Sequence, residues 1–376
     1  MVYLIILGIT SILAFFADTL YARSRNLSLF AGLLIVVALA TVAGLRDYSV
    51  GYDYLYYCHA DISEAMSANS WWSCLQHAEN DWGYTSIIYL ATLSSDSHHF
   101  AMFALSFVIL LLAYLACHNL RQYAPCWVLF SFYILILYAP SLNLIRQSLA
   151  ISSVFLAFSV YKKKYGGWKF WLLTILSFSF HKTSIIPIAV IVYANIVSYS
   201  SPTKQRTLTV AYIILAIVAL ALLKIVLDII SEQIPAFEKF TTYSNSNGKE
   251  GWREPGVSKL ALLFIIVYMG GMFLSYKYKL IDNKTLVVSF HIAFTALLCV
   301  FGGLYTNTVT RLCFYFWPLC YFYINIILSN NKVVSPRTNV LFIFVATIPF
   351  LYEFAKDRLF DSNDYLRYTS EILGIS

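Results

Sequence analysis

Long apolar segments alternate with short polar segments along almost the whole chain. A membrane-spanning helix needs about 20 mostly apolar residues, and about twelve segments approach this length. They cover residues 2–21, 27–45, 100–117, 125–140, 147–161, 168–180, 184–199, 208–230, 259–276, 286–305, 312–328 and 339–354. The pattern therefore predicts an all-α, polytopic integral membrane protein with about 12 transmembrane helices, forming a single transmembrane domain over residues 1–376.

Two polar regions interrupt this pattern. The first, residues 46–98, contains only one apolar stretch, residues 84–93, which is short for a complete crossing. We therefore expect an amphipathic, re-entrant or interfacial segment there. The second polar region covers residues 231–257.

Composition agrees with this class, since 60% of the residues are hydrophobic and only 12% are charged, which excludes an ordinary soluble globular protein. The net charge is +7, and lysine and arginine accumulate on alternate loops, as the positive-inside rule predicts for cytoplasmic loops. We therefore place both termini and the two polar regions outside, and we expect no nucleic-acid partner. The orienting residues are Arg23, Arg25, Arg121, Lys162, Lys163, Lys164, Lys169, Lys204, Arg206, Lys277, Lys279, Lys284, Lys332 and Arg337.

The seven cysteines form no C-x-x-C motif and show no spacing typical of metal ligands with histidine. We expect neither a bound metal nor another cofactor. Cys58 and Cys74 fall in the same outside region, where an oxidising compartment would allow them to pair.

Basic residues also stand at four outside ends of the expected spans, where the orienting rule does not explain them. They are Arg46, Arg146, the pair His181 and Lys182, and Arg311. Ionisable groups at membrane depth are costly and usually line a functional cavity. Because arginine holds phosphate oxygens through two parallel hydrogen bonds, the set indicates a site for a lipid-linked phosphate or diphosphate. The alternatives are arginines that extend toward lipid head groups and a histidine with a purely structural role.

Polar neighbours extend this candidate site. In a helix through residues 143–147, Asn143, Arg146 and Gln147 would share one face. The residues after Arg46 could contact sugar, although solvated carboxylates and an interfacial aromatic belt would explain the same pattern. These candidates are Asp47, Tyr52, Asp53 and Tyr57.

Several of these residues stand in five short motifs. They are Gly44-Leu45-Arg46-Asp47, Val50-Gly51-Tyr52-Asp53 with Tyr57, Asp81-Trp82-Gly83-Tyr84, Asn143-Leu144-Ile145-Arg146-Gln147-Ser148-Leu149-Ala150 and Phe180-His181-Lys182-Thr183-Ser184. In this order the motifs resemble the EpsG family of Wzy-type polysaccharide polymerases. The resemblance covers most of the N-terminal half, and beyond about residue 200 it is limited to Arg311 and Tyr315.

The resemblance implies a multi-pass protein of the bacterial inner (cytoplasmic) membrane with its active site facing the periplasm. Such a polymerase joins oligosaccharide repeat units of O-antigen (lipopolysaccharide), capsule or exopolysaccharide, with undecaprenyl-diphosphate-linked oligosaccharides as donor and acceptor. It is similar to GT-C-type glycosyltransferases that need no metal. Besides the lipid bilayer, the family implies a chain-length regulator protein as a partner.

This reaction assigns hypothetical roles to the candidate residues. Arg146 and Arg311, and next Arg46, would stabilise the diphosphate leaving group. An imidazole can accept a proton near neutral pH, so His181 is the candidate base, with Asp53 as the competing one. The expected substrate contacts are Arg46, Asp47, Tyr52, Tyr57, Asn143, Gln147, Lys182 and Tyr315.

Three other functions use similar features. An O-antigen ligase shares the donor and differs in its acceptor, whereas a flippase or exporter of the lipid-linked glycan would place basic residues inside its spans and show an internal repeat. A membrane acyltransferase would use a histidine reached from the cytoplasmic side, opposite to the side expected for His181.

Overall fold

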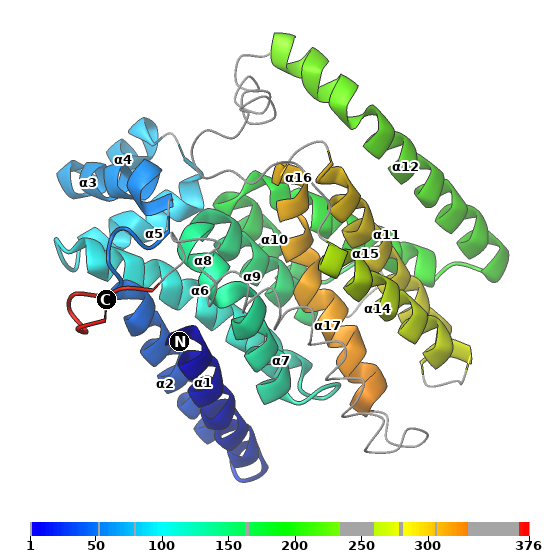
Figure 1. The fold of residues 1–376 in the computed structure, drawn as a ribbon, viewed down its shortest axis with the longest axis horizontal. Coiled ribbons are helices and arrows are strands. Elements are labelled where there is room, and N and C mark those ends of the chain that lie inside the picture. The colour runs from blue at the N-terminus through cyan, green and yellow to red at the C-terminus, as the bar shows by residue number, and fades with distance from the viewer. Residues whose placement is uncertain are drawn as a thin grey trace. The chain divides into compact units, whose positions relative to one another are not determined.

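The described part of the chain folds into helices in the computed structural model, and no β-strand forms among the described residues (Figure 1). The structure describes residues 2–51, 53–78, 80–161, 165–233, 259–277, 281–304, 307–329 and 368–375. The chain divides into two compact units, one formed by Met1–Ile188 with Phe350–Ser376 and the other by Ala189–Pro349. Each unit is described by itself.

Six described helical segments are long and apolar enough to cross a membrane, which agrees with an integral membrane protein. They are Val2–Ala22 (α1, Val2–Thr19, with η1, Leu20–Ala22), Arg25–Gly44 (α2), His98–Leu120 (α6), Cys126–Asn143 (α7, Cys126–Tyr133; η3, Ile134–Tyr138; α8, Ala139–Asn143), the Pro202–Leu222 part of α12 (Pro202–Gln233) and Asn283–Gly302 (α15).

Further helices coincide with the other apolar segments of the sequence. They are α9 (Ile145–Ser159), α10 (Trp168–Phe180), α11 (Ile185–Ser198), α14 (Lys259–Lys277) and α17 (Cys313–Ser329). The expected segment 339–354 lies outside the described residues. The all-helical class is thus confirmed, whereas the number of 12 crossings and the single transmembrane domain stay predictions.

Helix α9 forms the core of the first unit, where it packs against α6 and α10. Nearly all of its side chains are buried, including three serines, which would be unusual in the core of a water-soluble protein. Ser152 and Ser153 donate to the carbonyl oxygens of Ser148 and Leu149, each at 2.9 Å. These small side chains satisfy their own hydroxyls and let neighbouring helices approach closely, as is typical of packing in membranes.

The polar region 46–98 forms short helices on this core. They are η2 (Tyr54–Cys58), α3 (His59–Ser67), α4 (Trp71–His77) and α5 (Trp82–Thr92), and α5 packs against α6 and α10. At 11 residues α5 is too short for a complete crossing, as its sequence predicted. Cys58 and Cys74 are both buried free thiols, so the disulfide considered from the sequence does not form.

The helix that begins at Cys126 ends at Asn143, and α9 begins after a break at Leu144, whose φ of −98° and ψ of 57° are not helical. Asn143 therefore does not share a continuous helix with Arg146 and Gln147, contrary to the expectation of one common face. The break leaves Arg146 in the first turn of α9.

The second unit contains α12, α14, α15, α16 (Asn307–Arg311) and α17, in which α15 packs against each of the other four helices. Helix α11 runs across the boundary between the units. Helix α12 continues to Gln233, three residues into the expected polar region 231–257, and the rest of that region lies outside the described residues.

Candidate functional site

Arg46 follows the end of α2 and is buried, with 1% of its surface exposed. Its guanidinium donates from Nη1 to the Ala43 carbonyl at 2.6 Å, from Nε to Val50 at 3.2 Å and from Nη2 to Leu142 at 3.3 Å. A buried guanidinium is costly unless it is hydrogen-bonded, and these three carbonyls accept one hydrogen bond from each of its three nitrogens. Arg46 thus joins the end of α2, the turn that follows and the end of α8.

The same turn is held tightly against α8 by Gly51. Its φ of +92° lies in the region that favours glycine, and a Cβ at this position would stand 2.4 Å from the Leu142 carbonyl oxygen. After this turn, Asp53 stands immediately before η2 (Tyr54–Cys58).

The C-terminal segment binds the other side of this turn. Asp47 donates its backbone N–H to the Thr369 carbonyl and accepts from the backbone N–H of Glu371 at 2.8 Å. Ser370 donates to the Leu45 carbonyl, and Tyr368 donates to Val42 at 2.8 Å. In this structure Asp47, an expected substrate contact, therefore holds the chain terminus.

Asp53 and Tyr57 form the first part of a polar cluster. The backbone N–H of Asp53 donates to Asn143 Oδ1 at 3.2 Å, and the Tyr57 hydroxyl donates to the Asp53 carboxylate. Burial and then the negative charge of Asp53 raise the pKa of Tyr57, so its hydroxyl stays protonated and remains a donor.

Asp81 links the two strongest candidates from the sequence. Its Oδ2 lies 3.6 Å from Arg146 Nη1 and 3.4 Å from His181 Nδ1. The Asp81 side chain is only 8% exposed, whereas those of Arg146 and His181 are 25% and 28% exposed and remain accessible from outside the protein.

The guanidinium of Arg146 also lies over the ring of Tyr57, with Cζ 4.5 Å from the ring centroid. Its Nε is buried and has no hydrogen-bond partner within the part of the chain that the structure describes. Arg146 is therefore oriented by an aromatic face and by Asp81.

Helix ends bring these residues together. Asp81 stands immediately before α5, Arg146 in the first turn of α9 and His181 immediately after α10. Helices α5 and α10 can approach because Gly83 has no side chain, since a Cβ there would lie 2.2 Å from Ser179 Oγ.

A second carboxylate braces the segment that carries Asp81. The amide nitrogen of Asn80 donates to both carboxylate oxygens of Asp61, at 2.9 and 2.8 Å. Burial raises the pKa of Asp61, and the Asn80 hydrogen bonds oppose that shift. The polar cluster is therefore defined as Asp53, Tyr57, Asp81, Arg146 and His181, with Asp61, Asn80 and Asn143 supporting it.

The remaining expected site residues are not part of the polar cluster or lie outside the residues that the structure describes. Gln147 is buried in α9, and Lys182 is exposed in η4 (Lys182–Ser184). Tyr52 lies outside the described residues. Arg311, half-buried at the end of α16, and Tyr315, buried in α17, belong to the second unit, so their participation stays a prediction.

Sequence reasoning did not include Asp81 among the candidate site residues, although it stood in one of the quoted motifs and lies between Arg146 and His181 in the structure. The available signal was an acidic residue directly before a short helix whose second residue is glycine. Among the described residues, no group of three or more His, Cys, Asp and Glu side chains is placed to hold a metal ion.

These features define an all-helical membrane protein with a partly exposed Arg–Asp–His cluster where the ends of short helices meet. The chain belongs to the EpsG family, whose sequence model matches residues 29–370. EpsG is a Wzy-like polymerase family, so membership indicates a polysaccharide polymerase-like, glycosyltransferase-like role. The match confirms the expected resemblance and extends it well into the C-terminal half. No curated protein and no solved structure matches the chain.

Proposed function

We propose that this protein joins oligosaccharide repeat units carried on undecaprenyl diphosphate, at the periplasmic face of the bacterial inner membrane, by glycosyl transfer without a metal ion. Membership of the EpsG family supports the polymerase role. The observation that carries the assignment of the site is the Asp81 carboxylate between Arg146 and His181.

In the proposed reaction an acceptor hydroxyl oxygen attacks the anomeric carbon of the donor sugar. The bond from that carbon to the diphosphate oxygen breaks, and the diphosphate leaves with the electron pair. The proton of the acceptor hydroxyl passes to His181.

Arg146 stabilises the leaving group in this proposal. Charge develops on the diphosphate oxygen during transfer, and a fixed guanidinium with low exposure interacts with it strongly. The buried Nε of Arg146, which has no partner among the described residues, is a donor available to a phosphate oxygen.

His181 acts as the base, and Asp81 orients it. Because Asp81 faces Nδ1, the other ring nitrogen, Nε2, is left to accept the proton. The same carboxylate stabilises the positive charge that the imidazole then acquires. Asp53 is assigned to orient Tyr57 beneath Arg146, and Arg46 to hold the turn that carries Asp53.

Polymer length in a deletion strain complemented with variants tests this proposal. Arg146→Ala and His181→Ala should each lower polymerisation by about 10²-fold or more, because each removes a group that acts in the transition state. Arg206→Ala and His77→Ala are matched controls at exposed positions outside the polar cluster, and they should support polymer of normal length. Normal polymer from both Arg146→Ala and His181→Ala, at equal membrane levels of protein, would refute the assignment.

The glycan profile of the deletion strain separates the alternatives. Single capped repeat units indicate a polymerase, whereas intact polymer that remains on its lipid carrier indicates a ligase. Repeat units that accumulate on the cytoplasmic side indicate a flippase or exporter.

A further inference from the structure

Residues 368–375, the C-terminal segment, form a small hairpin that lies against the turn after α2. The backbone groups of Ser370 and Ile375 exchange hydrogen bonds of 2.7 and 2.9 Å, and Gly374 bends the hairpin with a φ of +66°, in the region that favours glycine. The Tyr368 ring packs edge-on against Tyr3 of α1, with the ring centroids 6.2 Å apart. The segment therefore has a shape of its own and is attached to α1.

The C-terminal segment also caps the end of α2. The last carbonyl oxygens of a helix lack intrahelical partners, which is costly at the edge of a membrane unless another donor reaches them. In α2 the carbonyls of residues 42–45 each accept a hydrogen bond from a side chain. The donors are Tyr368 to Val42 at 2.8 Å, Arg46 to Ala43 at 2.6 Å, His99 to Gly44 at 2.8 Å and Ser370 to Leu45. The C-terminal segment thus supplies two of the four donors at this helix end.

Asp47 is paired with the C-terminal segment through both its backbone and its side chain. Its N–H donates to the Thr369 carbonyl at 2.9 Å, and its carboxylate accepts from the Glu371 N–H at 2.8 Å. Arg46 reaches the carbonyls of residues 43 and 50, which lie on either side of Asp47 in the chain. Arg46 therefore holds the turn at its two ends, and the C-terminal segment holds it between them.

The turn leads to the residues that support Arg146. Asp53 lies two residues after Gly51, and its carboxylate accepts the hydrogen bond of the Tyr57 hydroxyl. The Tyr57 ring lies beneath the Arg146 guanidinium, with 4.5 Å between Cζ and the ring centroid. A shift of the turn is therefore expected to move Tyr57 relative to Arg146, although no residue of the C-terminal segment belongs to the polar cluster.

We propose that Tyr368 and Ser370 are positioning residues for glycosyl transfer. By completing the end of α2 and holding Asp47, the C-terminal segment keeps the turn in the position that the polar cluster requires. This inference rests on the proposed function, because it gives the segment a role in that reaction. It also makes Asp47 an anchor of the chain terminus, in place of the substrate contact expected from the sequence.

Hydrogen exchange in the purified full-length protein tests the contact without any substrate. Tyr368→Phe keeps the ring against Tyr3 and removes the hydroxyl, and Ser370→Ala removes the other side-chain donor. In each variant we expect the amides of residues 46–57 to exchange about fivefold faster, the factor that corresponds to one lost hydrogen bond. Peptides of α9 should exchange as in the unchanged protein.

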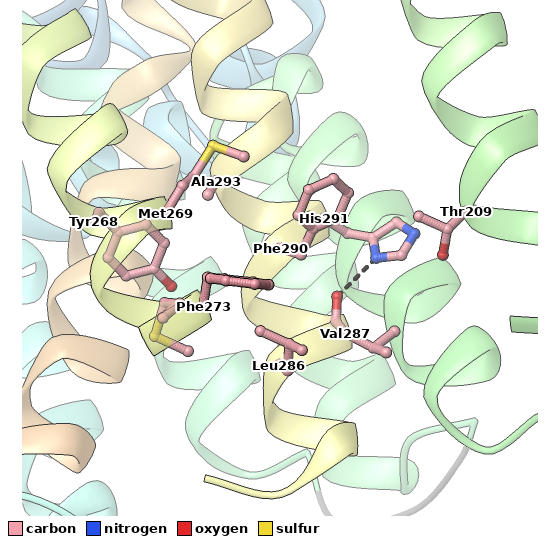
Figure 2. Close-up of a pocket in the computed structure, with 10 residues that line it drawn as sticks. Thr209, Tyr268, Met269, Phe273, Leu286, Val287, Phe290, His291 and Ala293 are labelled. Atoms are coloured by element: carbon pink, nitrogen blue, oxygen red, sulfur yellow. Dashed lines mark hydrogen bonds between the residues drawn. The ribbon is translucent and has the colours of Figure 1, made fainter. Parts of the chain in front are cut away.

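Tyr268→Phe is the matched control, because it removes a buried tyrosine hydroxyl from the second unit, where Figure 2 shows the residue on α14. It should leave both the exchange of residues 46–57 and the rate of chain extension unchanged.

Initial rates of chain extension from a lipid-linked donor test the positioning role. Tyr368→Phe and Ser370→Ala should each lower kcat about fivefold with little change in KM, because neither side chain touches substrate. Asp47→Asn keeps an oxygen that can accept from Glu371 and should retain most of kcat, whereas Asp47→Ala should lose about as much as Ser370→Ala. A higher KM in both Asp47 variants would contradict the anchor role and favour a substrate contact.

Unchanged exchange of residues 46–57 in both Tyr368→Phe and Ser370→Ala would overturn the proposal, whatever the protein polymerises. Normal kcat in both variants, in an assay where Arg146→Ala is inactive, would overturn it as well, since the turn would then move without consequence. Full activity of Arg146→Ala would overturn the proposed reaction and with it the positioning role, whereas faster exchange in the two variants would still confirm the contact itself.

Discussion

Single residues with the same chemistry have different environments in this protein. Arg46 and Arg146 both follow a helix end or break, and the sequence favoured both as anion ligands. Each of the three guanidinium nitrogens of Arg46 donates to a backbone carbonyl, whereas Arg146 is partly exposed and its buried Nε has no hydrogen-bond partner among the described residues. The difference arises because the carbonyls of Ala43, Val50 and Leu142 surround only Arg46.

Asp81→Asn tests the residue that the structure adds to the site. The amide keeps the shape of the side chain but removes the charge that orients His181 and stabilises its protonated form. We expect kcat for chain extension to fall by about 10²-fold or more, with little change in KM for the lipid-linked donor.

The control for this substitution is Asp96→Asn, which alters an exposed carboxylate in the same outside region. It should leave both kinetic constants unchanged. An Asp81→Asn enzyme with normal kcat would show that His181 does not need this carboxylate.

At the scale of elements, the site depends on close approaches between helices and turns. Gly83 lets α5 approach α10, and Gly51 lets the turn after α2 lie against α8. The C-terminal residues 368–371 then hold the same turn through side-chain and backbone hydrogen bonds. Contacts between residues 368–371 and residues 42–47 thereby hold in place the segment that precedes Asp53.

Gly51→Ala should destabilise the protein, because it places a Cβ 2.4 Å from the Leu142 carbonyl oxygen at a φ of +92°. The expected loss is about 1–3 kcal/mol, measured as a lower midpoint of thermal unfolding in detergent. Gly8→Ala is the matched control, since a Cβ at Gly8 within α1 would meet no atom within 4 Å. Alanine suits a helix better than glycine, so Gly8→Ala should unfold no earlier than the unchanged protein. Equal midpoints for both variants would contradict the close contact.

At the scale of the whole molecule, the orientation in the membrane decides which face the polar cluster serves. The distribution of lysine and arginine predicts that region 46–98 lies outside. It also predicts that the loop between α9 and α10, which contains Tyr165, lies in the cytoplasm. All seven native cysteines are buried, so added surface cysteines can report the orientation with little background.

Trp72→Cys and Tyr165→Cys test this orientation, because both side chains are exposed, at 62% and 58%. In intact spheroplasts a membrane-impermeant maleimide should label Trp72→Cys at once and Tyr165→Cys only after permeabilisation. The reverse order would place the polar cluster on the cytoplasmic face and would refute a periplasmic polymerase.

The amino-acid sequence was sufficient to predict the helical membrane class, the positions of most helices and the family, because the length of apolar segments and the order of motifs are local properties of the chain. It also marked Arg146 and His181 as candidate site residues, since ionisable residues at the ends of apolar segments stand out without a structure.

Which of these residues contact one another became known from the packing of the helices. Asp81 lies near both Arg146 and His181, which are far apart in sequence. Arg46 donates hydrogen bonds to three backbone carbonyls, and Asp47 accepts one from the C-terminal segment. These roles depend on which helix ends pack together, and that packing is fixed by contacts such as Gly83 against Ser179 that no local pattern reveals.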